Sequence, residues 1–374
     1  MTRLLRAARL FDGTRMHHDA ALIVDGDRVR GVTSEPWGAE DLGDVTLAPG
    51  FVDWHVNGGG GVLFNDVPEP ETLHTMARAH ARFGTTALLP TLITADAATL
   101  DSGAGALAAA RRDGLSGLVG IHFEGPNLAP AKRGIHDAAL MHPLDVRDLA
   151  RLSREDLGRV VVTLAPEVND LGHVRTLAKR GVTVSVGHSD ATYEQALAAF
   201  DAGARAVTHL WNAMSGLHHR RPGIVGAALS RPDVYAGCIA DGHHVHPTAL
   251  APFLAPGSMA RMTLVTDAMA TVGSEMDGFE WGGKRVIRAG GRLALEDGTL
   301  AGADIDMASS VRFAVERCGV SLADALRMAS ATPARMLGLR DRGHFRSGAR
   351  ADFVTLDGRL HVTSCYVGGR PVEN

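Results

Sequence analysis

The 374-residue sequence has few cysteines and few aromatic residues, and neither sign of charge dominates it. Its three cysteines, Cys238, Cys318 and Cys365, are odd in number and widely spaced. They therefore indicate neither a disulfide framework nor a CxxC zinc knuckle, which fits a reducing compartment. With 38 Lys and Arg against 42 Asp and Glu, the formal net charge is −4. This balance argues against a nucleic-acid partner and against binding to an anionic membrane surface.

Long apolar runs are also missing. No stretch approaches the length that a membrane helix needs, and arginines interrupt the N-terminal run MTRLLRAARLFDGTR before a signal-peptide core could form. We therefore expect a cytoplasmic protein without a membrane partner. What the sequence does contain is an ordinary globular composition, with 45% hydrophobic residues, and 18 histidines, which hint at metal or proton chemistry.

Both ends of the chain are rich in short strand-like segments. Residues 1–48 combine β-like stretches with Asp-Gly turns, and residues 345–374 repeat this pattern with turns at Asp357-Gly358 and Gly368-Gly369. We predict that the two ends assemble into one small β-sandwich domain.

The middle of the chain, residues 49–344, alternates apolar strand-like segments with amphipathic stretches rich in Ala and Leu. The expected strands are residues 50–56, 85–92, 118–124, 159–165, 182–188, 204–209, 235–241 and 262–267. Eight strands that alternate with helices are typical of a (β/α)8 barrel. A doubly wound sheet is the alternative, but the glycine run at 58–61 lacks the GxGxxG spacing of its phosphate loop. Residues 276–300 are expected to form a β-hairpin insertion.

Polar side chains collect at the carboxyl ends of these predicted strands. They are His55 and Asn57 after the first strand, Glu124 after the third, His188 after the fifth, His209 after the sixth and Asp267 after the eighth. Such ends converge on one face of a barrel, where active sites are built. Glu124, His188 and His209 would form a His2Glu set, which suits a catalytic zinc with one position open for water. Asp267 beside that water would be a general base and acid, or it would only cap the following turn.

Three loop segments, RGIHD, LHHRRPG and DGHHVHP, hold more histidines than one metal can use. Most of these histidines are expected to be solvated, while one or two would polarise a carbonyl or hold hydroxyl and phosphate groups. Asn212 and Ala213 offer backbone N–H groups after the sixth strand, and Arg220 offers a guanidinium that suits phosphate.

Six motifs follow one another in order between about residues 49 and 335. They are APGFVDWHVNGGGG, HFEGPNLAPAKRGIHD, VSVGHSDATYEQALAAFDAGARAVTHLWNAMSG, RRPGIVGAAL, IADGHHVHP and LVTDAMA. In order and spacing the chain resembles the N-acetylglucosamine-6-phosphate deacetylase family of the amidohydrolase superfamily. The EGP, GHS, THLxNAM and TDA blocks together are highly specific.

The resemblance implies a (β/α)8 barrel with a small β-sandwich domain, usually in a homodimer, that removes acetate from N-acetylglucosamine 6-phosphate in amino-sugar metabolism. It implies one divalent metal, with zinc expected first and iron, manganese or cobalt as alternatives. By motif position, the implied metal ligands are Glu124, His188 and His209, and the implied catalytic residues are Asp267 and His136. The implied substrate contacts are His136, Asn212, Ala213, Arg220, His244, Ala301 and Gly302.

The first predicted strand departs from the superfamily pattern. It ends in His55-Val56-Asn57, whereas many members have a His-x-His pair that binds a second metal. Because an amide oxygen is a much poorer ligand than imidazole for zinc, we expect one metal per chain.

Three alternatives stay open on the same scaffold. They are a deacetylase of N-acetylgalactosamine 6-phosphate, an amidohydrolase of an unphosphorylated amide, and a non-catalytic sugar-phosphate sensor. The sensor is disfavoured because no candidate ligand and no candidate acid–base residue is lost. A dinuclear cyclic amidohydrolase is disfavoured because no lysine ends a predicted strand.

Overall fold

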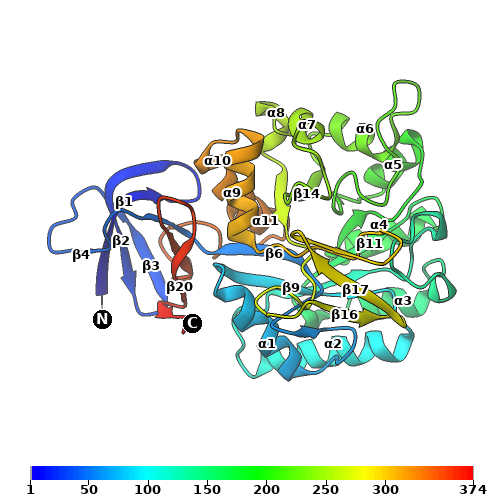
Figure 1. The fold of residues 1–374 in the computed structure, drawn as a ribbon, viewed down its shortest axis with the longest axis horizontal. Coiled ribbons are helices and arrows are strands. Elements are labelled where there is room, and N and C mark those ends of the chain that lie inside the picture. The colour runs from blue at the N-terminus through cyan, green and yellow to red at the C-terminus, as the bar shows by residue number, and fades with distance from the viewer. Residues whose placement is uncertain (1, 374) are drawn as a thin grey trace.

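A barrel of eight parallel strands and a second eight-stranded sheet beside it make up the core of the computed structural model, which describes residues 2–373 (Figure 1). The barrel strands are β6 (Phe51–Val56), β9 (Thr85–Ile93), β10 (Gly120–Glu124), β11 (Arg159–Leu164), β12 (Thr183–Val186), β13 (Ala206–Val207), β14 (Tyr235–Ile239) and β15 (Met262–Val265). They are hydrogen-bonded in chain order from β6 to β15. The predicted (β/α)8 barrel is therefore confirmed.

The barrel closes between its first and last strands. Val56 forms a parallel bridge with Ala268. The Asp267 N–H donates to the carbonyl of His55 at 2.9 Å, and the Asn57 N–H donates to the carbonyl of Ala268 at 2.9 Å. This closure places two segments that lie far apart in the sequence side by side, and so brings His55 and Asn57 next to Asp267.

The barrel strands are buried on both faces, as expected of parallel strands that helices cover. In β11, which reads RVVVTL, only the first residue is exposed. One apolar cluster joins residues of opposite strands, such as Val52, Val161 and Ile239, and therefore lies inside the barrel. A larger cluster packs the outer faces of the strands against the helices. Packing on both sides fixes the strand ends on which the polar residues sit.

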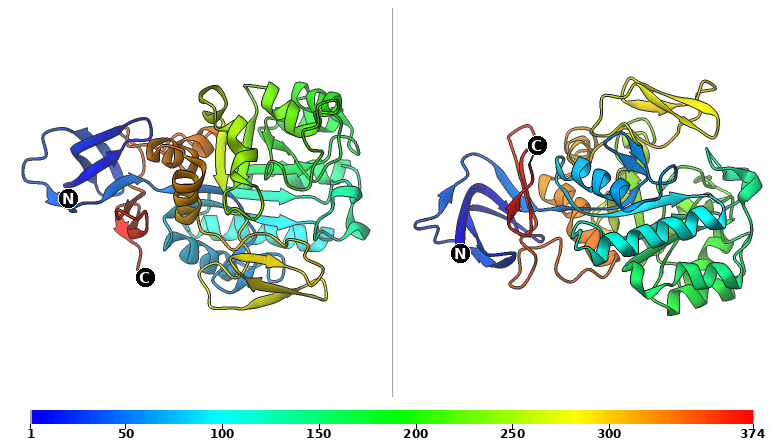
Figure 2. Two further views of the ribbon diagram at one scale, coloured as in Figure 1. Left: turned by 45° about the horizontal axis from the view of Figure 1, so that its top comes forward. Right: turned by 90° about the horizontal axis from the view of Figure 1, so that it is seen from below.

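Helices surround the barrel (Figure 2). They are α1 (Pro70–Ala81), α2 (Ala97–Arg112), α3 (Val146–Leu152), α4 (Leu171–Lys179), α5 (Tyr193–Asp201), α6 (Gly223–Ser230), α7 (Pro247–Leu250), α8 (Pro256–Met259), α9 (Met307–Cys318), α10 (Leu322–Ala329) and α11 (Ala331–Met336). The start of α5 is fixed by a capping box between Thr192 and Gln195, shortly after His188. No helix in the described part of the chain is long and apolar enough to cross a membrane.

The segment in which we expected a hairpin insertion holds a three-stranded antiparallel sheet. Its strands are β16 (Gly278–Trp281), β17 (Lys284–Ala289) and β18 (Arg292–Ala294). Phe279, Val286 and Leu293 belong to a small apolar cluster with Leu63 and Met269. The indole N–H of Trp281 donates to the carbonyl of Ile135 at 3.3 Å, so this small sheet is tied to the loop after β10.

Both chain ends contribute to the second sheet, which we call the terminal sheet. Its strands are β1 (Thr2–Phe11), β2 (Met16–Asp25), β3 (Arg28–Thr33), β4 (Glu40–Asp41), β5 (Thr46–Pro49), β19 (Phe353–Leu356), β20 (Val362–Val367) and β21 (Arg370–Pro371). Strand β19 pairs antiparallel with β5, which joins the C-terminal strands to the N-terminal ones. Leu5, Leu22 and Phe353 belong to a separate core that these strands enclose. The small sheet domain predicted from both termini is thus present.

Candidate metal centre and active-site pocket

The candidate site residues lie where the backbone turns sharply after the barrel strands. Seven non-glycine residues within 2–373 have a positive φ. Five of them lie just after β12, β13 or β15, namely His188, His209, Trp211, Ala213 and Asp267. A left-handed backbone is uncommon for residues other than glycine and is concentrated at functional sites. The backbone geometry therefore marks the same strand ends as the sequence pattern.

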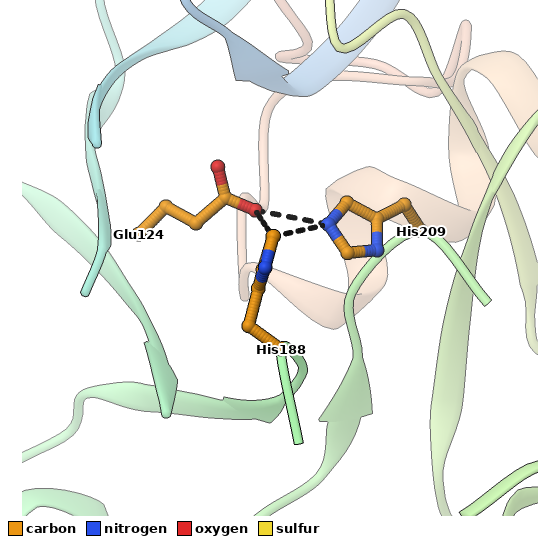
Figure 3. Close-up of side chains that lie close together, drawn as sticks. All are labelled: Glu124, His188 and His209. Carbon is orange, nitrogen blue, oxygen red and sulfur yellow. Dashed lines mark hydrogen bonds and ion pairs between the residues drawn. The ribbon is translucent and has the colours of Figure 1, made fainter. Parts of the chain in front are cut away.

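Glu124, His188 and His209 converge, as Figure 3 shows. Oε1 of Glu124 lies 3.1 Å from Nε2 of His209 and 3.3 Å from Nε2 of His188. The two Nε2 atoms are 2.9 Å apart. All three side chains are buried. Zinc bonds of roughly 2.0–2.2 Å in tetrahedral geometry place neighbouring ligand atoms about 3.3 Å apart, so this spacing fits one ion.

The protonation of the two histidines also fits a cation. Nδ1 of His188 lies 2.8 Å from the carbonyl of Lys132, and only a protonated Nδ1 can donate there. With the donated proton on Nδ1, Nε2 is the ring nitrogen that faces Glu124 and His209, which is the arrangement that metal-ligating histidines have. Burial lowers the pKa of His209, so its ring favours the neutral form. The buried cluster can therefore hold a metal ion.

A second group of donors adjoins the first. Nε2 of His55 lies 3.1 Å from Oε2 of Glu124 and 3.1 Å from Oδ1 of Asp267. Burial opposes a charge on His55, but the two carboxylates hold its pKa well above the ordinary value. His55 therefore carries a proton between Glu124 and Asp267. The donor atoms of these three residues also lie close enough together to hold a metal ion, which would replace that proton.

Asp267 has two oxygens in different surroundings. Oδ1 accepts a hydrogen bond from Nδ2 of Asn57 at 2.6 Å and faces His55, whereas Oδ2 accepts none from residues 2–373. Burial opposes ionisation of Asp267, but the charge of His55 lowers the pKa of the carboxyl below its ordinary value. Asp267 is thus an oriented carboxylate with one free oxygen.

His136 is held in its neutral form. Burial lowers the pKa of His136 to about 3. The backbone N–H of Thr94 points at Nδ1 of His136 at 3.4 Å, and the Thr94 hydroxyl lies 2.8 Å away. If Nδ1 accepts from this N–H, the ring proton is on Nε2. That atom lies 3.7 Å from Oε2 of Glu124, beside the metal centre.

A cavity of about 270 Å³ contains this cluster. Its lining is formed by Asn57, Ile93, Glu124, Lys132, Gly134, Ile135, His136, His188, His209, Asn212, Ala213, His244, Asp267, Met269, Leu300 and Gly302. The structure therefore brings together nine of the eleven site residues expected from the sequence. Arg220 and Ala301 do not line the cavity: Arg220 is exposed, and Ala301 is fully buried in the apolar cluster beneath the small insertion sheet.

The end of the cavity near Asn212 offers donors for an anion. The Asn212 N–H donates to the carbonyl of His209 at 2.9 Å, but within residues 2–373 the Ala213 N–H has no acceptor. Lys132, which the sequence analysis did not single out, supplies an ammonium that lies 3.3 Å from Asp190. Lys132 ends a short 3-10 turn directly before RGIHD and gives no periodic signal, so only the cavity lining reveals it.

Two further features shape the pocket. Nδ1 of His244 lies 2.6 Å from Oδ2 of Asp241, whose other oxygen accepts the His243 and His244 N–H groups. The sequence analysis missed Asp241, although it lies three residues before His244. Gly302 has φ +67°, and a Cβ there would lie 2.5 Å from Cγ of Met269. The wall of the pocket therefore requires glycine at this position.

Comparison with known proteins agrees with the geometry. The model of the amidohydrolase family matches residues 46–372. The chain is 41% identical to an N-acetylgalactosamine-6-phosphate deacetylase from Shewanella sp. (strain ANA-3), over 96% of this chain and 93% of that protein. It is 35% identical to an N-acetylglucosamine-6-phosphate deacetylase from Vibrio furnissii, over 98% and 94% respectively.

A solved structure supports the same relationship. It is that of a mutant N-acetyl-D-glucosamine-6-phosphate deacetylase from Mycobacterium smegmatis in complex with N-acetyl-D-glucosamine-6-phosphate. It superposes on this fold with a TM-score of 0.93 at 34% sequence identity, and all of both chains is covered.

Proposed function

The chain belongs to the amidohydrolase family, and on this premise we propose that it is a metal-dependent deacetylase of N-acetylglucosamine 6-phosphate. It hydrolyses the acetamido group and releases acetate and glucosamine 6-phosphate. The observation that carries the proposal is one cavity lined by a His2Glu cluster, by an oriented aspartate and by Lys132, a cation that suits phosphate. The names of the related enzymes support this substrate class.

Glu124, His188 and His209 would hold the metal, and zinc suits a site of two imidazoles and one carboxylate. A bound divalent ion lowers the pKa of water and polarises the amide carbonyl. One ion per chain is expected, because the protonated His55 already neutralises Glu124 and Asp267 at the adjoining position.

Asp267 moves the proton in this proposal. The Asn57 amide and His55 fix its Oδ1, so that the free Oδ2 takes a proton from the attacking water. The same oxygen later donates that proton to the departing amine nitrogen. Neutral His136, with its proton on Nε2, donates a hydrogen bond to the acetyl oxygen, where negative charge develops.

The rest of the cavity would position the sugar. His244, oriented by Asp241, contacts sugar hydroxyls or the phosphate, and the backbone around Ala301 and Gly302 borders the sugar. Lys132, Asn212 and the Ala213 N–H hold the phosphate. Arg220 lies on an exposed turn and does not line the cavity, so its role stays a prediction.

The C4 epimer, N-acetylgalactosamine 6-phosphate, is a second candidate substrate. The 41% identical Shewanella relative bears the name of an N-acetylgalactosamine-6-phosphate deacetylase, which is a specific reason to test it. The two sugars differ only in the orientation of one hydroxyl, and a site that hydrogen-bonds such a hydroxyl discriminates strongly between epimers.

An acetate-release assay tests the proposal. The metal-loaded protein is supplied with the two N-acetylhexosamine 6-phosphates and with both unphosphorylated sugars. We expect kcat/KM to be highest for the gluco 6-phosphate and to fall sharply without the phosphate. A higher value for the galacto epimer would select the second candidate, and no acetate release from any of the four would refute both. The cytoplasmic location that we expect from the sequence is a separate prediction, which concerns the compartment and not the activity.

A further inference from the structure

A second cavity, of about 600 Å³, lies at the opposite end of the barrel from the metal centre. Its wall comes from the end of α2, from the segments that lead into β10 and β11, and from residues near 339–350 that connect the barrel to the terminal sheet. Four arginines line this cavity, namely Arg111, Arg159, Arg342 and Arg350. We call it the arginine cavity.

Two of these arginines hold the barrel and the terminal sheet together. Arg342 and Arg350 both pair with the buried Asp352, which precedes β19. Nη2 of Arg342 also donates to the carbonyl of Ser116 in the barrel at 2.7 Å. Arg350 also lies 3.9 Å from Asp27. Two carboxylates therefore face these two guanidinium groups, and the ion pairs fix the positions of both.

The other two arginines have no carboxylate partner. Arg111 donates to the carbonyl of Asp156 at 2.8 Å, and Arg159 donates to the carbonyl of Gly338 at 2.8 Å. In the part of the chain from 2 to 373, no carboxylate oxygen lies within 4.0 Å of either guanidinium. The carboxylate that lines the cavity, Asp341, lies 3.5 Å from Arg28. The arginine cavity therefore carries excess positive charge in a chain of net charge −4.

These carbonyl contacts orient the guanidinium groups and leave donors unused. Each bond uses a terminal nitrogen, Nη1 in Arg111 and Nη2 in Arg159, so the Nε and the second terminal nitrogen stay available. Gly158 lies against Arg111, and a Cβ there would be 2.5 Å from its Cζ. Glycine at this position thus makes room for the guanidinium on the cavity wall.

We propose that the arginine cavity binds a phosphate-bearing anion through Arg111 and Arg159. Paired guanidinium donors at fixed positions match the oxygens of a phosphate group, and such charge-assisted hydrogen bonds are the strong kind. The cavity is large enough for a sugar phosphate as well as for inorganic phosphate. This site is separate from the deacetylase pocket. The bound anion contacts both the barrel and the segment that leads into the terminal sheet.

Hydrogen–deuterium exchange of the full-length, metal-loaded protein tests the proposal, with inorganic phosphate and glucose 6-phosphate as probes. Anion binding at the arginine cavity should slow exchange in residues 110–120, 156–160 and 338–352. The variant Arg111→Gln/Arg159→Gln should lose this protection and bind the probe at least about tenfold more weakly at this site. Its acetate release should stay unchanged, because neither residue touches the catalytic pocket.

The matched control is Arg112→Gln/Arg175→Gln, which removes the same charge from exposed positions on α2 and α4 outside the cavity. This variant should keep the protection. Protection by inorganic phosphate indicates a general phosphate site, whereas protection by glucose 6-phosphate alone indicates a sugar-phosphate site. The proposal is overturned if neither probe protects these segments in the wild type, or if the Arg111/Arg159 variant is protected as well as the control.

Discussion

Catalysis would depend on the different surroundings of the two carboxylate oxygens of Asp267. Asn57 and His55 hold Oδ1, and Oδ2 faces the cavity without a partner among the described residues. Asp267→Asn keeps the oxygen that accepts from Asn57 but cannot carry a proton. We expect kcat to fall by roughly 10²–10⁴, while the metal content and substrate affinity stay unchanged. Steady-state kinetics with metal analysis measures this, and turnover near the wild-type value would contradict the assignment.

Removing the charge of Lys132 or of Arg220 separately shows which of the two side chains binds the phosphate. Lys132→Ala removes the ammonium that lines the cavity, whereas Arg220→Ala removes an exposed guanidinium outside it. We expect KM for the 6-phosphate sugar to rise about 10- to 100-fold in Lys132→Ala and less in Arg220→Ala. The unphosphorylated sugar, assayed in parallel, should respond little to either change. Equal losses on both substrates would show a structural defect, and a larger effect of Arg220→Ala would favour the expectation from the sequence.

Asp53, below the metal centre, links stability to pH. Burial raises the pKa of Asp53 to about 6, although Thr266 and two backbone N–H groups stabilise the carboxylate. The unfolded chain has the ordinary value near 4. Between these pH values Asp53 is protonated in the folded state and ionised in the unfolded chain. The free energy of unfolding therefore falls as pH rises from about 4 to about 6, and it does not recover at higher pH.

Asp53→Asn should remove this dependence. An amide fits because the hydroxyl of Thr266 also lies 3.4 Å from the carbonyl of His55 and can reverse its hydrogen bond. The wild type should lose up to about 3 kcal/mol more stability than the variant between pH 4 and pH 7. Urea unfolding at both pH values measures this, and parallel pH profiles for the two proteins would refute the assignment.

At the scale of elements, the small insertion sheet supports the active-site loop. The indole N–H of Trp281, at the end of β16, bonds to the carbonyl of Ile135, the residue before His136. Trp281→Phe keeps an aromatic ring and removes this bond. Since one hydrogen bond contributes about 1 kcal/mol, we expect kcat/KM to fall about fivefold with little change in thermal stability.

Trp37→Phe is the matched control for this experiment. Trp37 is 88% exposed and lies in a loop of the terminal sheet domain, away from the pocket. Identical kinetics of the two variants would show that Trp281 does not position the loop.

At the scale of the whole molecule, the metal should stabilise the fold. The three ligands come from β10 and from the turns after β12 and β13, so one ion connects three separate barrel segments. Chelation should lower the thermal midpoint, because the ion binds the folded state only. Elemental analysis after extensive dialysis should find one equivalent per chain. Two retained equivalents, with activity lost when the second is removed, would overturn the single-metal proposal.

The domain boundaries, at residues 48/49 and 344/345, and the homodimer also stay predictions at this scale. The segment near 345 lies beside Arg342 and Asp352, which tie the barrel to the terminal sheet through a buried ion pair. The two parts are therefore expected to unfold together rather than as independent units.

The sequence by itself determined the barrel and the His2Glu cluster. Apolar strands alternate with amphipathic helices at a regular spacing. Glu124 ends its strand, and His188 and His209 each lie two residues beyond the end of theirs. Because parallel strand ends meet on one face, this local pattern was enough to place them together. The roles of His136, His244 and the phosphate-binding residues came from the family resemblance instead, since isolated loop residues carry no periodic signal.

Only the tertiary structure decided the contacts that join distant loops. Barrel closure put His55 and Asn57 against Asp267, and folding of the loop after β10 brought Lys132 into the cavity, while Arg220 stayed outside. The arginine cavity likewise depends on where the C-terminal segment meets the bottom of the barrel. Side-chain periodicity reports which face of an element is buried, whereas loop paths and the pairing of charges across segments are set by packing of the whole chain.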